Sequence, residues 1–260
     1  MVRGIEVFKA AFANYSGNYV IIGGTACERH EDNSGLIPRA IKDIDIILIV
    51  EALSHEFVSR FWSFIKDGGY TEKHIGEKSE EPQHQYYRFK NPSDTSYPAQ
   101  LELFSRSLGI LELPDDMHIT PIPTDADLSS LSAILMNDDY YHYTIEHSSV
   151  EDGVHIANIE SLIVLKCKAY LEMLAIKEAG GSADSKHIRK HRNDVFRMVA
   201  SLPPASPKFA VPTSLHEEIK LFCERVSEDM PDKNLIKDMG LRKGSPQDLL
   251  DRLKTMFEEQ

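Results

Sequence analysis

Apolar positions in the first part of the chain follow two periods, one typical of helices and one typical of strands. Helical spacing over residues 3–15 and 54–67 predicts two amphipathic helices, the second ended by Gly68 and Gly69. Short apolar runs predict four strands, at residues 19–22, 44–50, 85–90 and 99–105. The run at 44–50 is apolar throughout, as in a strand buried on both faces, and a turn-rich segment joins the last two strands as a hairpin. Helices that alternate with strands in this way are typical of a small mixed sheet.

The second part of the chain has helical periodicity alone. Residues 106–150 carry three prolines, and we expect them to be irregular. A long helix is predicted to begin after Asn158, a favourable N-cap, and to end at Gly180. Three further helices are expected, at residues 186–201, 214–229 and 246–257. We therefore predict an α/β (α+β) protein, with a mixed-sheet domain at 1–150 and a helical domain at 151–260.

The charge and the cysteine content of the chain exclude several classes of protein. The 29 Lys and Arg residues against 41 Asp and Glu give a net charge of −12, which argues against coating duplex DNA or an anionic membrane. Three cysteines far apart in the sequence fit a reducing compartment better than a disulfide framework or a structural zinc site. No apolar run approaches the ~20 residues of a membrane span, and the N-terminus does not resemble a signal peptide. We expect a cytoplasmic protein.

The sharpest chemical pattern is a glycine turn followed by two aspartates on the next strand. Asp43 and Asp45 are two residues apart in an extended segment, so their carboxylates share one face. Like charges placed so closely repel each other unless a cation lies between them, and carboxylate pairs suit Mg²⁺ or Mn²⁺. Gly23 and Gly24 allow backbone N–H groups to approach a phosphate at a helix start, and Thr25 adds a hydroxyl.

A third carboxylate comes from the last predicted strand, where Glu102 faces away from Leu101 and Leu103. Beside a two-carboxylate metal site, Glu102 would complete the metal cage and act as general base for an attacking hydroxyl. The structural alternative is that the glycines form only a turn and the aspartates only cap a strand. The three features in this order favour the catalytic interpretation.

At these positions the sequence resembles the polymerase-β-like nucleotidyltransferase superfamily. That signature is Gly-Gly or Gly-Ser, then Asp-x-Asp on the next strand, then an acidic residue on a later strand. The matching residues are Gly23, Gly24, Thr25, Asp43, Asp45 and Glu102. Residues 39–46, Arg-Ala-Ile-Lys-Asp-Ile-Asp-Ile, are similar to the Arg-x-Thr-x-Asp-x-Asp stretch of abortive-infection (AbiE-type) nucleotidyltransferase-like toxins.

Those toxins also carry a Lys-x-x-Ala helix and a Lys/Arg-x-Asp helix, to which Lys166…Ala169 and Arg192-Asn193-Asp194 are similar. The resemblance implies nucleotide-binding roles for Lys166 and Asp194. From the sequence alone, Lys166 lies on an apolar helix stripe and is equally compatible with a structural role, and Asp194 could hold it in place. Residues 186–197 hold five Lys or Arg and one acid, which indicates either an anion site or a solvated basic face.

The resemblance implies a small mixed-sheet nucleotidyltransferase domain followed by a helical domain, with the active site in the cleft between them. Such an enzyme moves a nucleoside monophosphate from an NTP to an acceptor hydroxyl on RNA or tRNA, a protein or a small molecule. It would be the toxin of a toxin–antitoxin pair, with an antitoxin protein as partner. A module that binds a nucleotide or a partner without turnover is the alternative, favoured by Glu102 where aspartate is commoner. A metal-dependent phosphohydrolase would need the same carboxylates.

Overall fold

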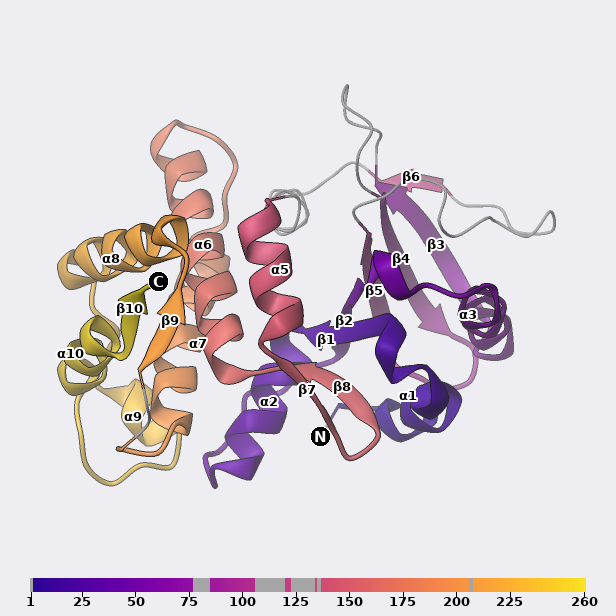
Figure 1. Ribbon diagram of the computed structural model, residues 1–260, viewed down its shortest axis with the longest axis horizontal. Coiled ribbons are helices and arrows are strands. Elements are labelled where there is room, and N and C mark those ends of the chain that lie inside the picture. The colour runs from indigo at the N-terminus through magenta and orange to yellow at the C-terminus, as the bar shows by residue number, and fades with distance from the viewer. Residues whose placement is uncertain (1, 77–84, 106–119, 123–133, 135–136, 206–207) are drawn as a thin grey trace. The chain divides into compact units, whose positions relative to one another are not determined.

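The computed structural model describes residues 2–76, 85–105, 120–122, 134, 137–205 and 208–260 (Figure 1). The chain divides into two compact units, which are described separately below. Unit 1 comprises residues 1–28, 40–124 and 148–157, and unit 2 comprises residues 29–39, 125–147 and 158–260. The fold is α+β, as the sequence predicts.

Unit 1 is built on a mixed eight-stranded sheet in the order β6-β3-β4-β5-β2-β1-β8-β7. The strands are β1 (Tyr19–Ile22), β2 (Asp43–Leu48), β3 (Tyr70–Gly76), β4 (Gln85–Pro92), β5 (Gln100–Ser105), β6 (Thr120–Ile122), β7 (Ser148–Glu151) and β8 (Val154–Ala157). At the centre, β2 runs parallel to β5 and antiparallel to β1, and β4 runs antiparallel to β5. This arrangement places the Asp-x-Asp strand between the glycine-turn strand and the Glu102 strand.

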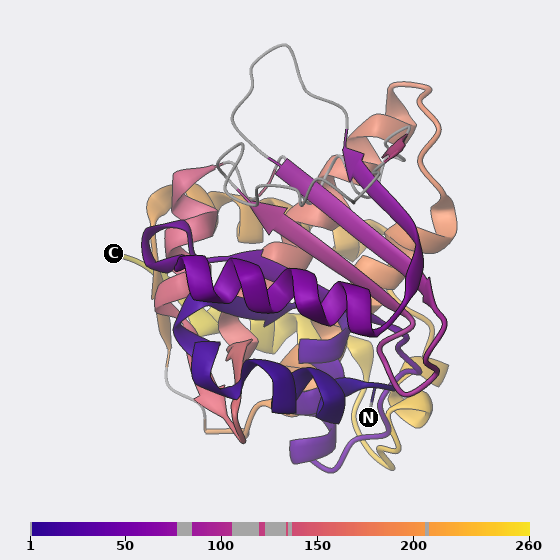
Figure 2. The same cartoon turned by 90° about the vertical axis from the view of Figure 1, so that its right-hand side faces the viewer.

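Helices cover one face of this sheet. Unit 1 contains α1 (Ile5–Phe12), the 3₁₀ segments η1 (Ala13–Asn18) and η2 (Val50–Ala52), the start of α2 (Gly23–Asn33), and α3 (His55–Asp67). Helices α1 and α3 lie side by side across the sheet (Figure 2), and Phe12 and Phe64 join them with ring centroids 5.2 Å apart. Phe61 of α3 reaches Phe89 of β4 at 5.6 Å. The core of unit 1 is thus an aromatic layer between these helices and one sheet face.

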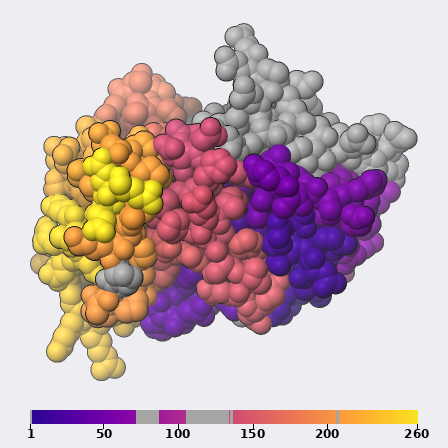
Figure 3. Space-filling model, viewed as in Figure 1, coloured from indigo at the N-terminus to yellow at the C-terminus, as the bar shows by residue number. Residues whose placement is uncertain are grey.

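The described residues of unit 2 are helical apart from one two-stranded parallel sheet. Its elements are α5 (Asp138–Glu146), α6 (Ile159–Glu178), α7 (Ser185–Ser201), β9 (Phe209–Val211), α8 (Thr213–Glu228), α9 (Asn234–Asp238), α10 (Pro246–Met256) and β10 (Phe257–Glu259). Helix α6 packs against both α7 and α8, and Tyr170 meets Phe222 edge to face at 5.1 Å. In the space-filling view the C-terminal residues lie at the surface over the segment that holds β9 and α8 (Figure 3).

The predicted strands at 19–22, 44–50, 85–90 and 99–105 and the predicted long helices are confirmed within one to a few residues at their ends. The expectation that residues 106–150 are irregular is wrong where the structure describes them. Helix α5 forms there, because Asn137 caps its first turn and three tyrosines are buried on it. The rest of 106–136 lies almost wholly outside the described residues.

The sequence analysis missed several strand pairings, and those of β3 and of the β7–β8 hairpin show why. Strand β3 has a polar sequence without alternation, and it forms because its backbone pairs with β4. Strands β7 and β8 form a hairpin around Asp152 and Gly153, which have φ of 49° and 80°. An Asp-Gly pair is a recognised hairpin signal, so this turn was readable from the sequence. Among the described helices, none is long and apolar enough to span a bilayer.

Candidate active site

Strand β2 divides its side chains between the two faces of the sheet. Ile44 and Ile46 are buried, whereas Asp43 and Asp45 are only partly buried and share the opposite face. In the ladder, Asp45 is level with Ile22 of β1 on one side and with Glu102 of the parallel strand β5 on the other. Neighbours in register project to the same face of a sheet. The structure therefore brings all three predicted carboxylates to one face of unit 1, opposite α1 and α3.

Gly23 lies directly behind the carboxylate of Asp45. It follows β1, begins α2, and has φ of +66°, a conformation that side chains of L residues disfavour. A Cβ atom at Gly23 would come within 1.9 Å of Asp45 Oδ2. The missing side chain thus serves two purposes, because it permits the turn and admits the carboxylate to the start of a helix. The positive end of a helix stabilises negative charge placed there.

The next two residues anchor the start of β2. A Cβ on Gly24 would approach Ile41 Cδ1 to 2.8 Å, so the turn packs tightly on the segment before Asp43. The hydroxyl of Thr25 is buried and donates a hydrogen bond to the backbone oxygen of Asp43 at 2.6 Å. That hydroxyl, assigned to phosphate binding by the resemblance, therefore fixes the peptide of the first aspartate.

Glu102 is buried and is held by two neighbours. Its Oε1 accepts hydrogen bonds from Arg88 Nε at 2.7 Å and from Gln100 Nε2 at 2.6 Å. Within the described part of the chain, Oε2 of Glu102 accepts no hydrogen bond. Arg88 stands opposite Glu102 in the antiparallel β4–β5 ladder and was missed by the sequence analysis. The sequence carried part of the signal, because alternation with Tyr87 and Phe89 puts Arg88 on the polar face of its strand, and the β4–β5 ladder then sets it opposite Glu102.

The environment of Glu102 favours its protonated form. Burial raises the pKa of its carboxyl most, and the negative charge of Asp45 raises it further. The positive charge and hydrogen bond of Arg88 act in the opposite direction, and the net result is a pKa of about 8. The Asp45 contribution indicates two carboxylates close enough to repel each other. A cation bound between them would relieve that repulsion.

The carboxylates of this site suit a divalent ion by their chemistry. Within the described residues, no group of three or more His, Cys, Asp or Glu side chains is arranged to hold a metal ion. Asp43 and Asp45 fit an Mg²⁺ or Mn²⁺ ion that takes one or two protein carboxylates and completes its shell with water and substrate phosphates. Arg88 and Gln100 hold one oxygen of Glu102, and the metal-ligand role expected of Glu102 stays a prediction.

Lys166 and Asp194 form a buried ion pair in unit 2. The Nζ atom of Lys166 on α6 lies 3.1 Å from Asp194 Oδ2 on α7, and both side chains are less than a tenth exposed. Arg39 reaches the same oxygen at 3.4 Å. Burial alone would raise the pKa of Asp194, but Lys166 and Arg39 outweigh it and lower the pKa below its ordinary value. The two residues singled out by the resemblance are thus partners of one another.

The basic helix α7 is only partly a solvent-facing surface. Arg192 is buried and binds Asp229 with Nη1 2.5 Å from Oδ2. Arg197 is also buried and forms a two-point contact with Glu31 at 2.8 and 2.9 Å. Lys186 and Arg189 are exposed. Part of the positive charge of this segment is therefore paired with carboxylates inside unit 2, which neither hypothesis expected, and the anion site stays a prediction.

Comparisons with known proteins add little to this geometry. No family model matches the chain, and no curated protein matches it. Among solved structures, the chain is similar to the crystal structure of the Megavirus polyadenylate synthase, with 12% sequence identity and a TM-score of 0.39. The likeness covers 86% of this chain and 36% of the viral one, so the chain spans about a third of that protein. A likeness of this size carries no argument about activity.

Proposed function

We propose that the chain is a magnesium-dependent nucleotidyltransferase of the polymerase-β-like superfamily. It moves a nucleoside monophosphate from an NTP to an acceptor hydroxyl and releases pyrophosphate. The observation that carries the proposal is the position of Asp45. Its carboxylate packs on Gly23 at the start of α2, and on β5 it is level with Glu102. A carboxylate beside a glycine turn and a helix N-terminus brings a cation site and a phosphate site together.

Each residue has a separate task in this proposal. Asp43 and Asp45 hold the metal ion, with Thr25 fixing the backbone of Asp43. The ion, when bound, neutralises charge that develops on the phosphates during transfer. Gly23 and Gly24 place backbone N–H groups at the start of α2 beside the NTP phosphates.

Glu102 takes the proton from the attacking hydroxyl. Arg88 and Gln100 fix its orientation through Oε1, which leaves Oε2 as the proton acceptor. Effective general bases are held within hydrogen-bond reach of the proton they remove and have a pKa near the working pH. Arg88 is then a positioning residue, because it acts through Glu102.

The wider biological role rests on the resemblance of the sequence motifs. We propose that the acceptor is RNA or tRNA, with a protein or a small molecule as further candidates, and that the chain is a cytoplasmic toxin neutralised by an antitoxin protein. In this proposal Lys166 binds the nucleotide, and Asp194 orients the ammonium group of Lys166 through their ion pair.

A second function, binding of a nucleotide or partner without turnover, is favoured by one observation. Burial raises the pKa of the Glu102 carboxyl to about 8, so its protonated form predominates at neutral pH. If Glu102 stays protonated when a nucleotide is bound, the site has two metal ligands and no base. The protein would then recognise an NTP without transferring it.

Transfer of label from α-³²P-NTPs separates the two functions. The wild-type chain, incubated with Mg²⁺ and a cell extract that supplies acceptors, should label one class of molecule, and Asp45→Asn should abolish the labelling. Asp67→Asn, which changes an exposed aspartate at the end of α3, is the matched control and should label normally. Nucleotide binding by the wild type without labelling of RNA, protein or small molecules would favour the binding module instead.

A further inference from the structure

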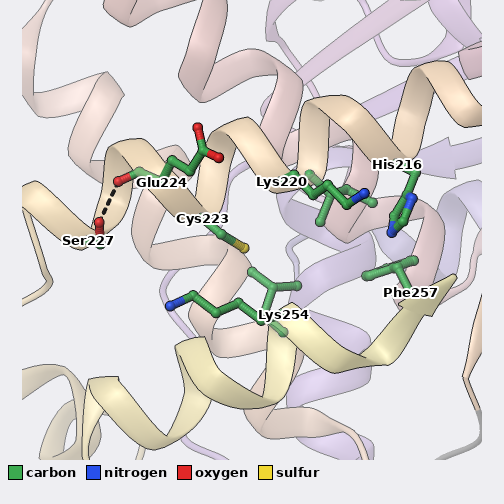
Figure 4. A pocket seen from close by; sticks show the side chains of 9 residues that line it. His216, Lys220, Cys223, Glu224, Ser227, Lys254 and Phe257 are labelled. Atoms are coloured by element: carbon green, nitrogen blue, oxygen red, sulfur yellow. Dashed lines mark hydrogen bonds between the residues drawn. The ribbon is translucent and has the colours of Figure 1, made fainter.

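Unit 2 contains a cavity of about 260 Å³ between α8 and α10 (Figure 4). The ammonium groups of Lys220 and Lys254 point to opposite ends of that cavity, so they do not act together on one ligand group. Basic side chains do converge elsewhere in unit 2, on the carboxylate of Asp194 in α7.

Three basic side chains surround the carboxylate of Asp194, and we call these four residues the Asp194 cluster. Asp194 Oδ2 lies 3.1 Å from Lys166 Nζ and 3.4 Å from Arg39 Nη2. His191 precedes Asp194 by one turn of α7, and residues three apart are neighbours on a helix surface. Burial raises the pKa of Asp194, but the charges of the three basic residues outweigh it and lower that pKa below its ordinary value. All three therefore act on this carboxylate at close range.

The loop that carries Arg39 is fixed to α7 by a second buried contact. Arg197, three residues after Asp194 on α7, binds both carboxylate oxygens of Glu31 at 2.8 and 2.9 Å. The same guanidinium donates to the backbone oxygen of Ile37, and Glu31 Oε2 accepts the backbone N–H of Arg39 at 3.2 Å. The place of Arg39 beside Asp194 is thus set by the backbone of its loop.

Two nitrogen atoms of the Asp194 cluster have no hydrogen-bond partner in the described residues. They are Nε of Arg39 and Nδ1 of His191, and both are inaccessible to solvent. A guanidinium is always protonated in proteins, so Nε of Arg39 is a donor that lacks an acceptor. Burial lowers the pKa of His191 well below its ordinary value, and Lys166 lowers it further, so the imidazole is neutral and can carry its one proton on Nδ1. Buried polar groups are ordinarily hydrogen-bonded, and two orphans beside one carboxylate indicate an acceptor that a ligand supplies.

We propose that Arg39 and His191 join Lys166 in binding a phosphate group of the NTP, and that Asp194 orients these donors. A terminal phosphate group presents three acceptor oxygens, one for each of the three side chains, and cationic donors form the strongest hydrogen bonds with it. The inference rests on the proposed function, in which Lys166 binds the nucleotide, and it adds Arg39 and His191 to that task. All four residues of the Asp194 cluster belong to unit 2.

Calorimetric titration of the full chain with tripolyphosphate in EDTA tests the Asp194 cluster without a base, a ribose or a metal ion. The wild type should bind tripolyphosphate, and His191→Phe should bind it ~10-fold more weakly, because a hydrogen bond to a charged group is worth about a factor of ten. His191→Asn keeps an N–H donor close to the position of Nδ1 and should bind like the wild type. His142→Phe, the same change at an exposed histidine of α5, should also leave binding unchanged.

Stability and a second donor separate a ligand contact from a structural role. Since Nδ1 of His191 has no partner in the described residues of the ligand-free protein, His191→Phe should not lower the melting temperature, whereas loss of a structural hydrogen bond would. Arg39→Lys keeps a charge beside Asp194 but removes Nε, and it should weaken tripolyphosphate binding ~10-fold. Arg189→Lys, at an exposed arginine of α7, is the matched control and should bind like the wild type.

Three outcomes would overturn the proposal. The first is that the wild type does not bind tripolyphosphate at millimolar concentrations. The second is wild-type affinity in either His191→Phe or Arg39→Lys, which would mean that water alone satisfies that nitrogen atom. The third is that a single-stranded RNA without a terminal phosphate displaces tripolyphosphate as well as an NTP does, which would assign the site to the acceptor backbone. Tripolyphosphate binding that both variants weaken, in a protein that transfers no nucleotide, would support this site and contradict the transferase function alone.

Discussion

Replacement of Gly23 by alanine perturbs the proposed site at its most crowded point. Two costs arise at that position. A non-glycine residue in the left-handed region costs ~1–2 kcal/mol. In addition, the new Cβ would lie 1.9 Å from Asp45 Oδ2, more than 1 Å inside the 3.0 Å that such contacts ordinarily keep. Displacing the carboxylate adds ~1–3 kcal/mol, the usual range for overpacking.

Gly35 provides a matched control, because its φ is +72° and a Cβ there would meet no atom within 4 Å. Gly35→Ala therefore carries only the backbone cost, and Gly23→Ala carries both. At ~2–4 °C per kcal/mol for a chain of this size, Gly23→Ala should lower the melting temperature by ~2–12 °C more than Gly35→Ala does. Thermal unfolding followed by circular dichroism measures that difference.

The displacement of Asp45 also predicts a change in metal binding. Gly23→Ala should weaken Mn²⁺ binding in the presence of an NTP at least ~10-fold, as expected when one charged ligand is lost. Gly35→Ala should leave the Mn²⁺ affinity unchanged. Equal melting temperatures for the two variants, together with wild-type Mn²⁺ affinity in Gly23→Ala, would refute the reasoning about this turn.

The other predictions concern single contacts. Thr25→Val removes a buried hydrogen bond and should cost ~1 kcal/mol in denaturant unfolding, whereas Thr71→Val, whose hydroxyl bond is exposed, should cost much less. Lys166→Met leaves the buried Asp194 carboxylate without its nearest cation and should cost ~3 kcal/mol at pH 7, a loss that adding Asp194→Asn should largely reverse. Because the folded-state pKa of Glu102 is raised to about 8, ionisation of this group destabilises the fold as the pH rises from about 5 to 8. Glu102→Gln should therefore be more stable than the wild type at pH 8.5 and similar at pH 5, and a pH-independent difference would contradict that assignment.

That the side chains of Asp43 and Asp45 share one face could be predicted from the sequence, because residues two apart in a strand project to the same side of the sheet. The position of Glu102 beside Asp45 was expected from the order of the motifs and the resemblance, but the residue pattern of its strand does not fix it. It depends on β5 pairing in parallel with β2, while the β4–β5 hairpin is antiparallel, and alternation within one strand carries no information about its neighbours. The contact between Arg88 and Glu102 follows only once that ladder is known.

The same limit applies to the helical part. Helix α6 was predictable from its N-cap at Asn158 and its terminal glycines, and the apolar stripe that includes Lys166 was visible. Which carboxylate neutralises Lys166 was not, since Asp194 comes from another helix and Arg39 from a loop. Helix α5 was missed because its three tyrosines have low helix propensity and are retained in a helix by burial.

Release of pyrophosphate tests the central claim most directly. Wild-type protein incubated with Mg²⁺, an NTP and total RNA, protein or small-molecule fractions should release one pyrophosphate for each nucleotide incorporated into one of them. Glu102→Gln should lose that release while its affinity for the NTP stays within a fewfold of the wild type, because only the proton acceptor is changed. Release of inorganic phosphate instead of pyrophosphate by the wild type, or an undiminished rate in Glu102→Gln, would contradict the account.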